Sequence, residues 1–423
     1  MVKELKHTEI GDIPVDWELQ TFDETFRVIS NNTLSRENLN NRGGAVRNIH
    51  YGDILTKFPE VLDCNEEEIP YVNELSLLSS STQLLQDGDI VVADTAEDET
   101  VGKVIEVQNL GDSKLVAGLH TIPCRVKKGD FAPGWLGYYM NSDLFHNQIL
   151  PYITGIKVSS ISKGAISETL ILVPPFDEQE KIVQSLNKIQ LLMTSETKVV
   201  NKIKLVKNGC LSKMFPQKDD TVPEMRLPGF TEAWEQRKLG ELGTITTGNT
   251  PSTSIPDYYS DDGIVWVTPT DICENITFES ARKLSDLGQQ VGRVVPKNTI
   301  LVTCIASIGK NTMLGNTGSF NQQINGLTPN ENKYDPYFLL TESALWSAKM
   351  KGSAAAGTMQ IVNRTEFSEL KTWLPSLIEQ QAIGAFFKQL DHLITLHQCK
   401  CDKYSNIKKG MMSDLLTGKI RLV

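Results

Sequence analysis

The chain has 423 residues, too many for one ordinary hydrophobic core, and this length predicts two or three domains. Hydrophobic residues make up 40% and charged residues 22%, which is typical of a globular protein and excludes a disordered one. The formal net charge of −10 argues against a surface that is basic throughout, so any contact with nucleic acid must be confined to local faces.

The start of the chain and its cysteines predict a cytoplasmic protein with no membrane partner. The sequence MVKELKHTEIGD is charged and lacks the apolar segment of a signal peptide, and no apolar run reaches the length of a membrane span. The seven cysteines are odd in number and form no CxxC pair, so reduced thiols are expected. Cys399 and Cys401 fall in a helical pattern, which we interpret as helix rather than as a metal site.

The region from Phe22 to Val173 predicts a mixed α and β domain. Short β-branched runs such as Asp87–Thr95 and Val101–Val107 are bounded by Gly, Asp and Asn, as strands are. The loop Val28–Ser35 is rich in Asn, Thr and Ser, whose side chains can bond to base edges and phosphates. An ordinary surface loop would have the same composition.

A long helix is predicted after Pro174 and Pro175, which stop the preceding strand. Asp177 and Glu178 fall in the first turn, where the helix dipole favours anions, and Pro216 ends the helix. Apolar residues recur at alternating spacings of four and three, which indicates a coiled-coil seam. This first seam consists of Ile182, Leu186, Ile189, Met193, Val200 and Ile203, with Glu196 as a polar member.

The second half of the chain repeats this order. Strands are predicted within Ile264–Ile272, Asn298–Leu314 and Ser319–Pro329, and Thr246–Ser254 is a polar loop. After Pro375 a second helix continues to the C-terminus. Its seam consists of Ile383, Phe387, Leu390, Ile394, Cys401 and Tyr404, with His397 as the polar member.

An offset of 201 residues relates the two helices and pairs Gln179 with Gln380 without a gap. A second echo pairs Trp17 with Trp234 near the start of each half, and the distance from this tryptophan to the proline turn is 157 residues in the first half and 141 in the second. The frame is therefore duplicated, whereas the segments inside it differ. This pattern indicates one scaffold that carries two different specificity modules.

Glu196 and His397 occupy equivalent positions near the middle of the two helices. If the helices pair antiparallel about a pseudo-twofold axis, these two side chains face each other and fix the register at some cost in stability. The alternative is that both point to water after an irregularity in the heptad.

No motif nominates an active site. The tripeptide GKN that ends at Asn311 resembles the end of a phosphate-binding loop, but Cys304 and Asn311 occupy positions that require Gly and Ser or Thr. The tetrapeptide VPPF resembles a motif of amino-methyltransferases, but Val173 lacks the side-chain oxygen that would hold the target amino group. No GxGxxG follows a strand, so no S-adenosylmethionine pocket is evident.

The order and duplication of these parts resemble the specificity (S) subunit of type I restriction-modification enzymes. The resemblance covers nearly the whole chain and rests on EIGDIPVDWEL, GDIVVADT followed by VGK, NTILVTCIASIGK, the two PP/PS and EQ helix starts, and MMSDLLTGKIRL. It implies an α+β fold in which two globular target recognition domains are joined by two long antiparallel coiled-coil helices. The expected boundaries are 1–174 for the first recognition domain, 175–216 for the central helix, 217–375 for the second recognition domain and 376–423 for the C-terminal helix.

The resemblance also implies a function. Each recognition domain would read one half of a split, asymmetric site in double-stranded DNA, and the helices would dock two methyltransferase subunits, which restriction subunits then join. The chain itself would catalyse nothing, and S-adenosylmethionine is expected only on the methyltransferase partner. A stand-alone DNA-modifying enzyme and a coiled-coil adaptor that binds no DNA are the two alternatives.

Candidate DNA contacts are nominated by residue type and position. In the second domain Gln322 and Gln323 suit bidentate contact with adenine, and Ser307 and Lys310 lie beside a small-residue turn. In the first domain Lys103 occupies the place of Lys310. The other candidates are Asn31, Asn32, Thr33, Arg47, His120 and Lys157 in the first domain and Asn249, Thr250, Thr253 and Gln360 in the second.

Overall fold

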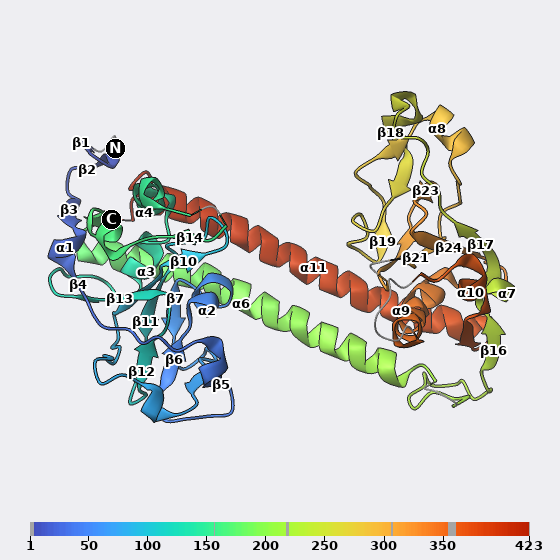
Figure 1. Cartoon of the computed structure of the whole chain (residues 1–423), viewed down its shortest axis with the longest axis horizontal. Coiled ribbons are helices and arrows are strands. Elements are labelled where there is room, and N and C mark those ends of the chain that lie inside the picture. The colour runs from blue at the N-terminus through green and yellow to red at the C-terminus, as the bar shows by residue number, and fades with distance from the viewer. Residues whose placement is uncertain (1–3, 156, 217–219, 306–307, 354–360, 423) are drawn as a thin grey trace. The chain divides into compact units, whose positions relative to one another are not determined.

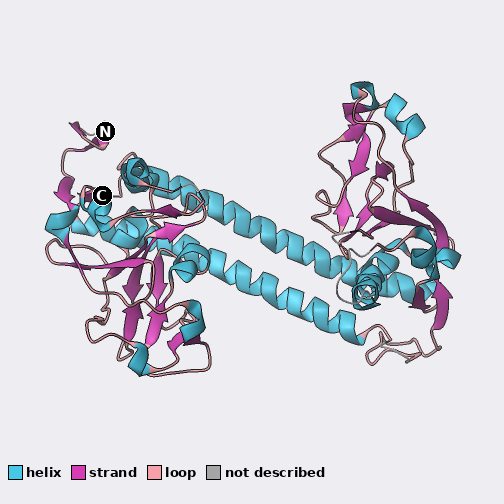
Figure 2. Ribbon diagram, in the orientation of Figure 1, coloured by secondary structure: helices cyan, strands magenta, loops and turns pink. Residues whose placement is uncertain are grey.

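The structure is a computed structural model that describes residues 4–155, 157–216, 220–305, 308–353 and 361–422. The chain divides into two compact units: unit 1 contains residues 1–195 and 400–423, and unit 2 contains residues 196–399. Both units contain sheets and helices (Figures 1 and 2), so the predicted α+β class is confirmed. In the described part of the chain, no helix combines the length and the apolar character that crossing a membrane requires.

The main sheet of unit 1 has five strands in the order β4-β13-β9-β11-β7. The first three neighbouring pairs are antiparallel, and β11 pairs in parallel with β7. All four residues of β9 are apolar and buried, as expected for a strand that is covered on both faces. The strands are β4 (Phe26–Val28), β7 (Val61–Asp63), β9 (Ile90–Ala93), β11 (Val104–Gln108) and β13 (Thr121–Val126).

A second, four-stranded sheet in unit 1 has the order β12-β6-β8-β5, with β12 and β6 in parallel. Its strands are β5 (Leu39–Asn40), β6 (Arg47–Ile49), β8 (Tyr71–Val72) and β12 (Leu115–Ala117). Three small pairs are formed by β1 (Leu5–Thr8) with β2 (Gly11–Pro14), β3 (Glu18–Thr21) with β15 (Leu170–Val173), and β10 (Thr95–Ala96) with β14 (Ser159–Ser160). The short helices are α1 (Phe22–Thr25), α2 (Tyr51–Thr56), α3 (Trp135–Tyr139), α4 (Asp143–Ile149) and α5 (Lys163–Ser167).

Unit 2 repeats the main sheet with the order β17-β24-β21-β22-β19. If the five strands of each main sheet are numbered along the chain, both sheets have the order 1-5-3-4-2, with a parallel pair only at the last step. The two inserted segments therefore share a fold although their sequences show almost no likeness. The strands are β17 (Gly243–Thr247), β19 (Ile276–Thr277), β21 (Ile300–Thr303), β22 (Asn311–Leu314) and β24 (Ile324–Pro329).

The remaining elements of unit 2 form a three-stranded sheet, a two-stranded pair and four helices. The sheet has the order β20-β18-β23, and the pair joins β16 to β25. The strands are β16 (Glu235–Lys238), β18 (Tyr259–Val267), β20 (Lys283–Leu284), β23 (Gly318–Phe320) and β25 (Lys371–Leu374). The helices are α7 (Leu239–Leu242), α8 (Asp286–Val291), α9 (Pro336–Ser353) and α10 (Arg364–Glu369).

Two long helices, α6 (Phe176–Lys213) and α11 (Leu377–Leu415), contribute to both units. In unit 1, Leu186 at the start of α6 is buried in the same core as Leu415 at the end of α11. In unit 2, Phe387 at the start of α11 contacts Phe215 just beyond the end of α6, with ring centroids 5.9 Å apart. Each unit therefore holds an antiparallel pair of helix segments. Full burial of one such side chain stabilises the fold by about 1.5–3 kcal/mol.

The sequence repeat makes one polar contact twice. In unit 1, Lys408 Nζ donates to Gln190 Oε1 at 2.7 Å, and in unit 2, Lys207 Nζ donates to Asp391 Oδ1 at 2.5 Å. The 201-residue offset relates Lys207 to Lys408 and Gln190 to Asp391. Equivalent residues on α6 and α11 thus exchange roles, which is the signature of an internal pseudo-twofold repeat.

Glu196 and His397 are in contact, as the repeat predicts. His397 Nδ1 lies within hydrogen-bond distance of Glu196 Oε2. The side chains are only 20% and 17% exposed, so the pair lies in the seam and does not point to open water.

The duplicated glutamines form the joint at the start of each long helix. Gln179 accepts from the backbone N–H of Ala132 at 2.9 Å and donates to the carbonyl of Pro174 at 2.8 Å. Gln380 accepts from the N–H of Asp335 at 3.0 Å and donates to the carbonyl of its own preceding proline at 2.9 Å. Each amide therefore ties its helix to the proline turn and to the start of a second helix.

The duplicated glutamates are held by arginines that follow the ends of the long helices. Arg421 donates from Nε and Nη2 to both carboxylate oxygens of Glu178 at 2.6 Å, and Trp17 Nε1 donates to the same carboxylate at 3.0 Å. Arg226 makes the equivalent two-pronged bond to Glu379, with both distances 2.7 Å. The Glu-Gln pair is therefore an architectural element in both copies.

Candidate nucleic-acid interface

One edge of the main sheet of unit 1 collects several polar loops. Strands β4 and β9 end at this edge and strands β11 and β13 begin there, because the neighbouring pairs are antiparallel. Strand β14 crosses the same edge by pairing with β10 (Figure 1). We name this surface edge 1; it consists of residues 29–35, 94–103, 118–120 and 157–161.

Unit 2 presents the corresponding edge of its own main sheet. Strands β17 and β21 end there and β22 and β24 begin there. An isolated bridge between Ile305 and Ile361 brings the segment before α10 to the same place. We name this surface edge 2; its described residues are 248–255, 304–305, 308–310 and 321–323.

Two of the nominated asparagines on edge 1 support its loops from within. Asn31 Nδ2 donates to the carbonyl of Thr121 at 2.8 Å, and Asn32, which is buried, donates to Asn48 Oδ1 at 2.7 Å. Both amides bond to other parts of the chain, whereas the side chain of Thr33, the next residue, is exposed. On this loop Thr33 is the better placed of the three to meet an external molecule.

His120 lies on edge 1 in an unusual backbone conformation. Its φ of 57° is in the left-handed region, which residues other than glycine rarely adopt and which is often associated with function. The imidazole is 44% exposed, and its Nδ1 lies 3.2 Å from Thr95 Oγ1 and 3.4 Å from Asp94 Oδ1. Tyr51 packs edge-on against the ring at 5.3 Å. The sequence nominated His120 but gave no signal for Tyr51, which the fold brings from α2.

The two lysines nominated as equivalents differ in their surroundings. Lys103 Nζ donates to the carbonyls of Leu55 at 3.2 Å and Phe58 at 3.4 Å, and burial lowers the pKa of Lys103. It thus stabilises the C-terminal end of α2, where the helix dipole favours a cation. Lys310 is exposed on edge 2 and donates to the carbonyl of Pro269 at 3.0 Å. Of the two, Lys310 is better placed to reach a phosphate.

On edge 2 an exposed hydroxyl and an exposed amide lie together. Thr250 Oγ1 donates to Gln322 Oε1 at 2.5 Å, and this bond does not use the amide N–H groups of the exposed Gln322. Asn249, in contrast, bonds within the chain: its Nδ2 donates to the carbonyl of Val291 at 2.9 Å and its Oδ1 accepts from Arg293 N at 2.8 Å. Asn249 therefore shapes the loop that presents Thr250.

The other nominated residues fall in three classes. Thr253 on edge 2 and Lys157 on edge 1 are exposed. Gln323 accepts from Asn321 Nδ2 at 3.1 Å and is half-buried. Ser307 and Gln360 lie outside the described residues.

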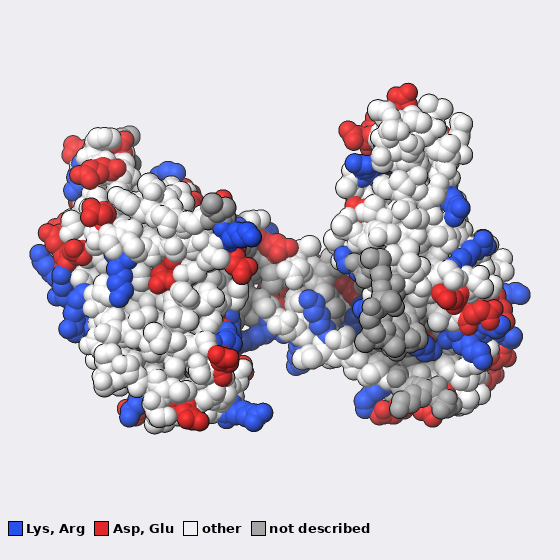
Figure 3. Space-filling view, in the orientation of Figure 1, with Lys and Arg blue, Asp and Glu red and all other residues white. Residues whose placement is uncertain are grey.

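The two edges differ in charge. Edge 1 carries Asp94, Glu97, Asp98 and Glu99 on one loop, whereas Lys310 is the single charged residue among the described residues of edge 2. Carboxylates repel phosphates but can accept a hydrogen bond from the amino group of cytosine, whereas amides suit adenine and hydroxyls are less selective. On the face shown in Figure 3, basic and acidic side chains are interspersed on each unit. Within the described residues, no group of three or more His, Cys, Asp or Glu side chains is arranged to hold a metal ion.

The sequence matches the family model of the type I restriction modification DNA specificity domain twice, over residues 14–205 and 231–403. The chain belongs to this family. It is a DNA sequence-specificity subunit of the type I restriction-modification class, and the matches fall on the two copies of the repeat.

Curated relatives match this specificity subunit over part or nearly all of its length. A type I restriction enzyme specificity subunit assigned to the MjaX system of Methanocaldococcus jannaschii is 24% identical over 429 residues, covering 99% of this chain and 96% of the relative. The HindI specificity subunit of Haemophilus influenzae is 26% identical over 197 residues, covering 44% of this chain and 42% of its own. A crystal structure of the type I S subunit from M. genitalium has a TM-score of 0.59 at 13% identity and covers 98% of this chain and 99% of that chain, which shows the fold.

Arg47 is not brought together with the other nominated residues of the specificity subunit. It is only 9% exposed and lies on β6 in the second sheet, where its Nη1 donates to the carbonyl of Cys64 at 2.6 Å. The end of β6 that meets edge 1 is Ile49, whose carbonyl accepts from Gly118 N at 2.9 Å. Arg47 therefore serves a different part of the recognition module.

The residues nominated for the helix seam follow the predicted period in their burial. Leu191 and Leu205 between seam positions are strongly exposed. Helices α6 and α11 begin at Phe176 and Leu377, next to the expected boundaries at 175 and 376, but the division into recognition domains and spacers stays a prediction. Buried seam residues are Ile182, Leu186, Val200, Ile383 and Phe387; half-buried ones are Ile189, Met193, Glu196, Ile203, Leu390, Ile394, His397, Cys401 and Tyr404.

Proposed function

We propose that units 1 and 2 each read one half of a split, asymmetric site in double-stranded DNA, through edge 1 and edge 2. The observation that carries this proposal is that one strand order, 1-5-3-4-2, presents unlike side chains at the same edge in the two units. Edge 1 offers a cluster of carboxylates and His120 beside Thr33 and Lys157, whereas edge 2 offers amides, hydroxyls and Lys310 without a carboxylate among its described residues. Because base edges differ in their donors and acceptors, unlike edges favour unlike half-sites.

The long helices are proposed to dock two copies of a methyltransferase subunit, which restriction subunits then join in the cytoplasm. The 201-residue repeat supports this, because a surface that occurs twice suits two copies of one partner. The specificity subunit itself is proposed to transfer no methyl group and to cut no DNA. S-adenosylmethionine would be held by the methyltransferase partner.

The decisive experiment is methylome sequencing of cells with and without this gene, followed by a chimera. In the chimera, residues 22–173 are replaced by the corresponding segment of another specificity subunit. We expect a two-part methylated motif in which the chimera changes one half and leaves the other unchanged. A continuous motif, or a change in both halves, would contradict the division of reading between the units.

Two binding measurements separate the alternatives. A stand-alone enzyme would bind S-adenosylmethionine or methylate DNA as the purified chain, and we expect neither. An adaptor that binds no DNA would leave the chain with its methyltransferase partner unable to prefer one split duplex over random duplex. We expect a clear preference that weakens as the salt concentration rises.

A further inference from the structure

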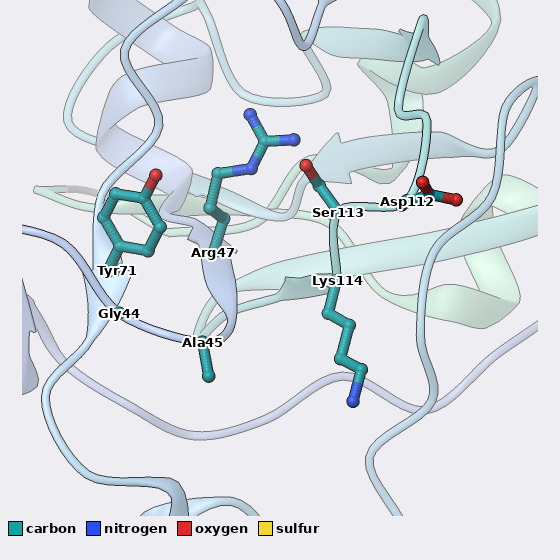
Figure 4. Close-up of a pocket in the computed structure, with 7 residues that line it drawn as sticks. All are labelled: Gly44, Ala45, Arg47, Tyr71, Asp112, Ser113 and Lys114. Carbon is teal, nitrogen blue, oxygen red and sulfur yellow. The ribbon is translucent and has the colours of Figure 1, made fainter.

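Unit 1 contains a cavity of about 230 Å³ that lies outside edge 1. It is lined by residues 44–45, Arg47, Tyr71 and residues 112–114 (Figure 4). These residues come from the second sheet and from the loops that precede β6 and β12. The proposed reading of DNA by edge 1 makes no use of this cavity.

The cavity and edge 1 lie at opposite ends of the same two strands. Arg47 and Leu115 are partners at the start of the parallel pair β6 and β12, and Gly118 at the other end belongs to edge 1. Gly118 follows Lys114 by four positions along the chain, which spans about 13 Å at roughly 3.3 Å per extended residue. This span is similar to the width of about 12 Å of the DNA major groove.

Several hydrogen-bond donors in the cavity lack an acceptor. Arg47 is nine-tenths buried, yet only its Nη1 donates, to the carbonyl of Cys64. Within the described residues, the rest of the guanidinium and the hydroxyls of Tyr71 and Ser113 have no hydrogen-bond partner. In Figure 4 the guanidinium lies between the ring of Tyr71 and the hydroxyl of Ser113. These donors are open to the cavity, so an anionic acceptor placed there would bond to them.

The charges around the cavity favour an anion. Lys114, which is exposed, adds a second cation to Arg47, while Asp112 is the only acidic residue of the lining. In Figure 4 the Asp112 carboxylate points away from the guanidinium. The backbone at Gly44 packs closely against Tyr71, since a Cβ at this position would lie 2.9 Å from the Cβ of Tyr71.

We propose that this cavity is an oxyanion site that binds a phosphate group through Arg47, Tyr71, Ser113 and Lys114. The planar fork of a guanidinium together with hydroxyl donors matches the oxygens of phosphate. The phosphate belongs either to the backbone of the duplex that edge 1 reads, which rests on the proposed function, or to free inorganic phosphate. In the first case the cavity positions unit 1 on DNA without reading sequence.

The first test uses the purified full chain and inorganic phosphate at constant ionic strength. The midpoint of thermal unfolding is expected to rise saturably with phosphate, compared with chloride. The rise should disappear in the Tyr71→Phe/Ser113→Ala double variant, which keeps the packing of both residues, and in Arg47→Lys, which keeps the charge but loses the fork. Lys128→Gln, which changes an exposed lysine elsewhere in unit 1, should respond like the native chain.

The second test uses the complex of the full chain with its methyltransferase partner and duplex DNA. Lys114→Gln is expected to weaken binding equally for the specific and for random duplexes and to lower the slope of log Kd against log salt by about one. The matched Lys128→Gln variant should leave this slope unchanged.

The outcomes distinguish the sources and the proposals. A phosphate response without a change in DNA binding assigns the site to free phosphate, and a DNA response assigns it to the duplex backbone. If neither response occurs, or if Lys128→Gln behaves like the cavity variants, the site does not exist as proposed. A methylome motif that stays split in that case would leave the proposed function intact.

Discussion

Replacing Arg421 with Met tests whether the C-terminal segment holds the start of α6 in place. Arg421 donates to both oxygens of Glu178 at 2.6 Å and to those of Asp16 at 2.9 and 2.7 Å, and it lies over the ring of Trp17 at 5.4 Å. Removing one partner of a buried ion pair costs about 3–5 kcal/mol. The N–H groups of Trp17 and Leu422 and the helix dipole still stabilise the carboxylate, so we expect a loss of about 3 kcal/mol.

The same variant should weaken the dependence of stability on pH at this joint. Burial alone would raise the pKa of Glu178, but the hydrogen bonds from Arg421 and Trp17 lower it below its ordinary value. A carboxylate with a lowered folded pKa stabilises the fold above its unfolded pKa, and this contribution is lost as the pH falls through the folded pKa. Without Arg421 the burial dominates, so the variant should lose less stability on acidification than the native chain does.

The assay is urea unfolding of the full chain at pH 7, combined with hydrogen exchange in the first turns of α6. The control is Arg226→Met, which removes the equivalent bond to Glu379 and should loosen the first turns of α11 instead. Adding Glu178→Gln to Arg421→Met should recover part of the loss, because no buried charge remains. A loss below about 1 kcal/mol for Arg421→Met, or additive effects in the double variant, would refute the reasoning.

Three further predictions concern other sites. Burial raises the pKa of Glu342 to about 8, so its contribution to stability is present while it is protonated and is lost as the pH rises from about 4.5 to 8. The free energy of unfolding of Glu342→Gln should therefore exceed that of the native chain by on the order of 3 kcal/mol at pH 8 and by little at pH 4. Identical urea curves for both chains would contradict this. Gln322→Ala should weaken the binding free energy for one half-site by about 1–3 kcal/mol, which gel shifts on duplexes with one or the other half-site mutated would measure. Equal losses of binding at both half-sites would contradict the place of Gln322 on edge 2. Replacing both Glu196 and His397 with Leu should raise stability by about 1–4 kcal/mol while hydrogen exchange in the seam becomes faster, and an unchanged exchange pattern would argue against a role in register.

The repeated parts of this fold were predictable because they repeat physical patterns. The alternating spacing of four and three along α6 and α11 specifies a buried stripe whatever surrounds it, and the 201-residue offset placed Glu196 opposite His397. The arginine that bonds to the start of each long helix also has a signal in the sequence. The dipeptide Arg226-Leu227 after α6 has a counterpart in Arg421-Leu422 after α11.

The edges were predictable only as regions. Lys103 and Lys310 occupy equivalent places beside a glycine, yet α2 ends next to Lys103 and draws its ammonium to two carbonyls. Arg47 stands in a polar-looking run, but β6 is buried and turns the side chain toward Cys64. Contacts of this kind join residues far apart in sequence. Local propensity and periodicity do not determine which distant residue the fold brings next to a given side chain.

The two copies of the repeat differ where specificity requires it and agree where the architecture requires it. Positions that are identical in the two copies, such as Gln179 and Gln380, make the same bonds in both units, so their duplication reflects a shared structural demand. Positions at the sheet edges have equal places in the strand order but unequal chemistry, as His120 and Gln323 show. Nothing in the scaffold requires this difference, because both main sheets close with the same pairing. The difference between the edges is therefore explained by what each edge binds, and a ligand with two unlike halves would account for it.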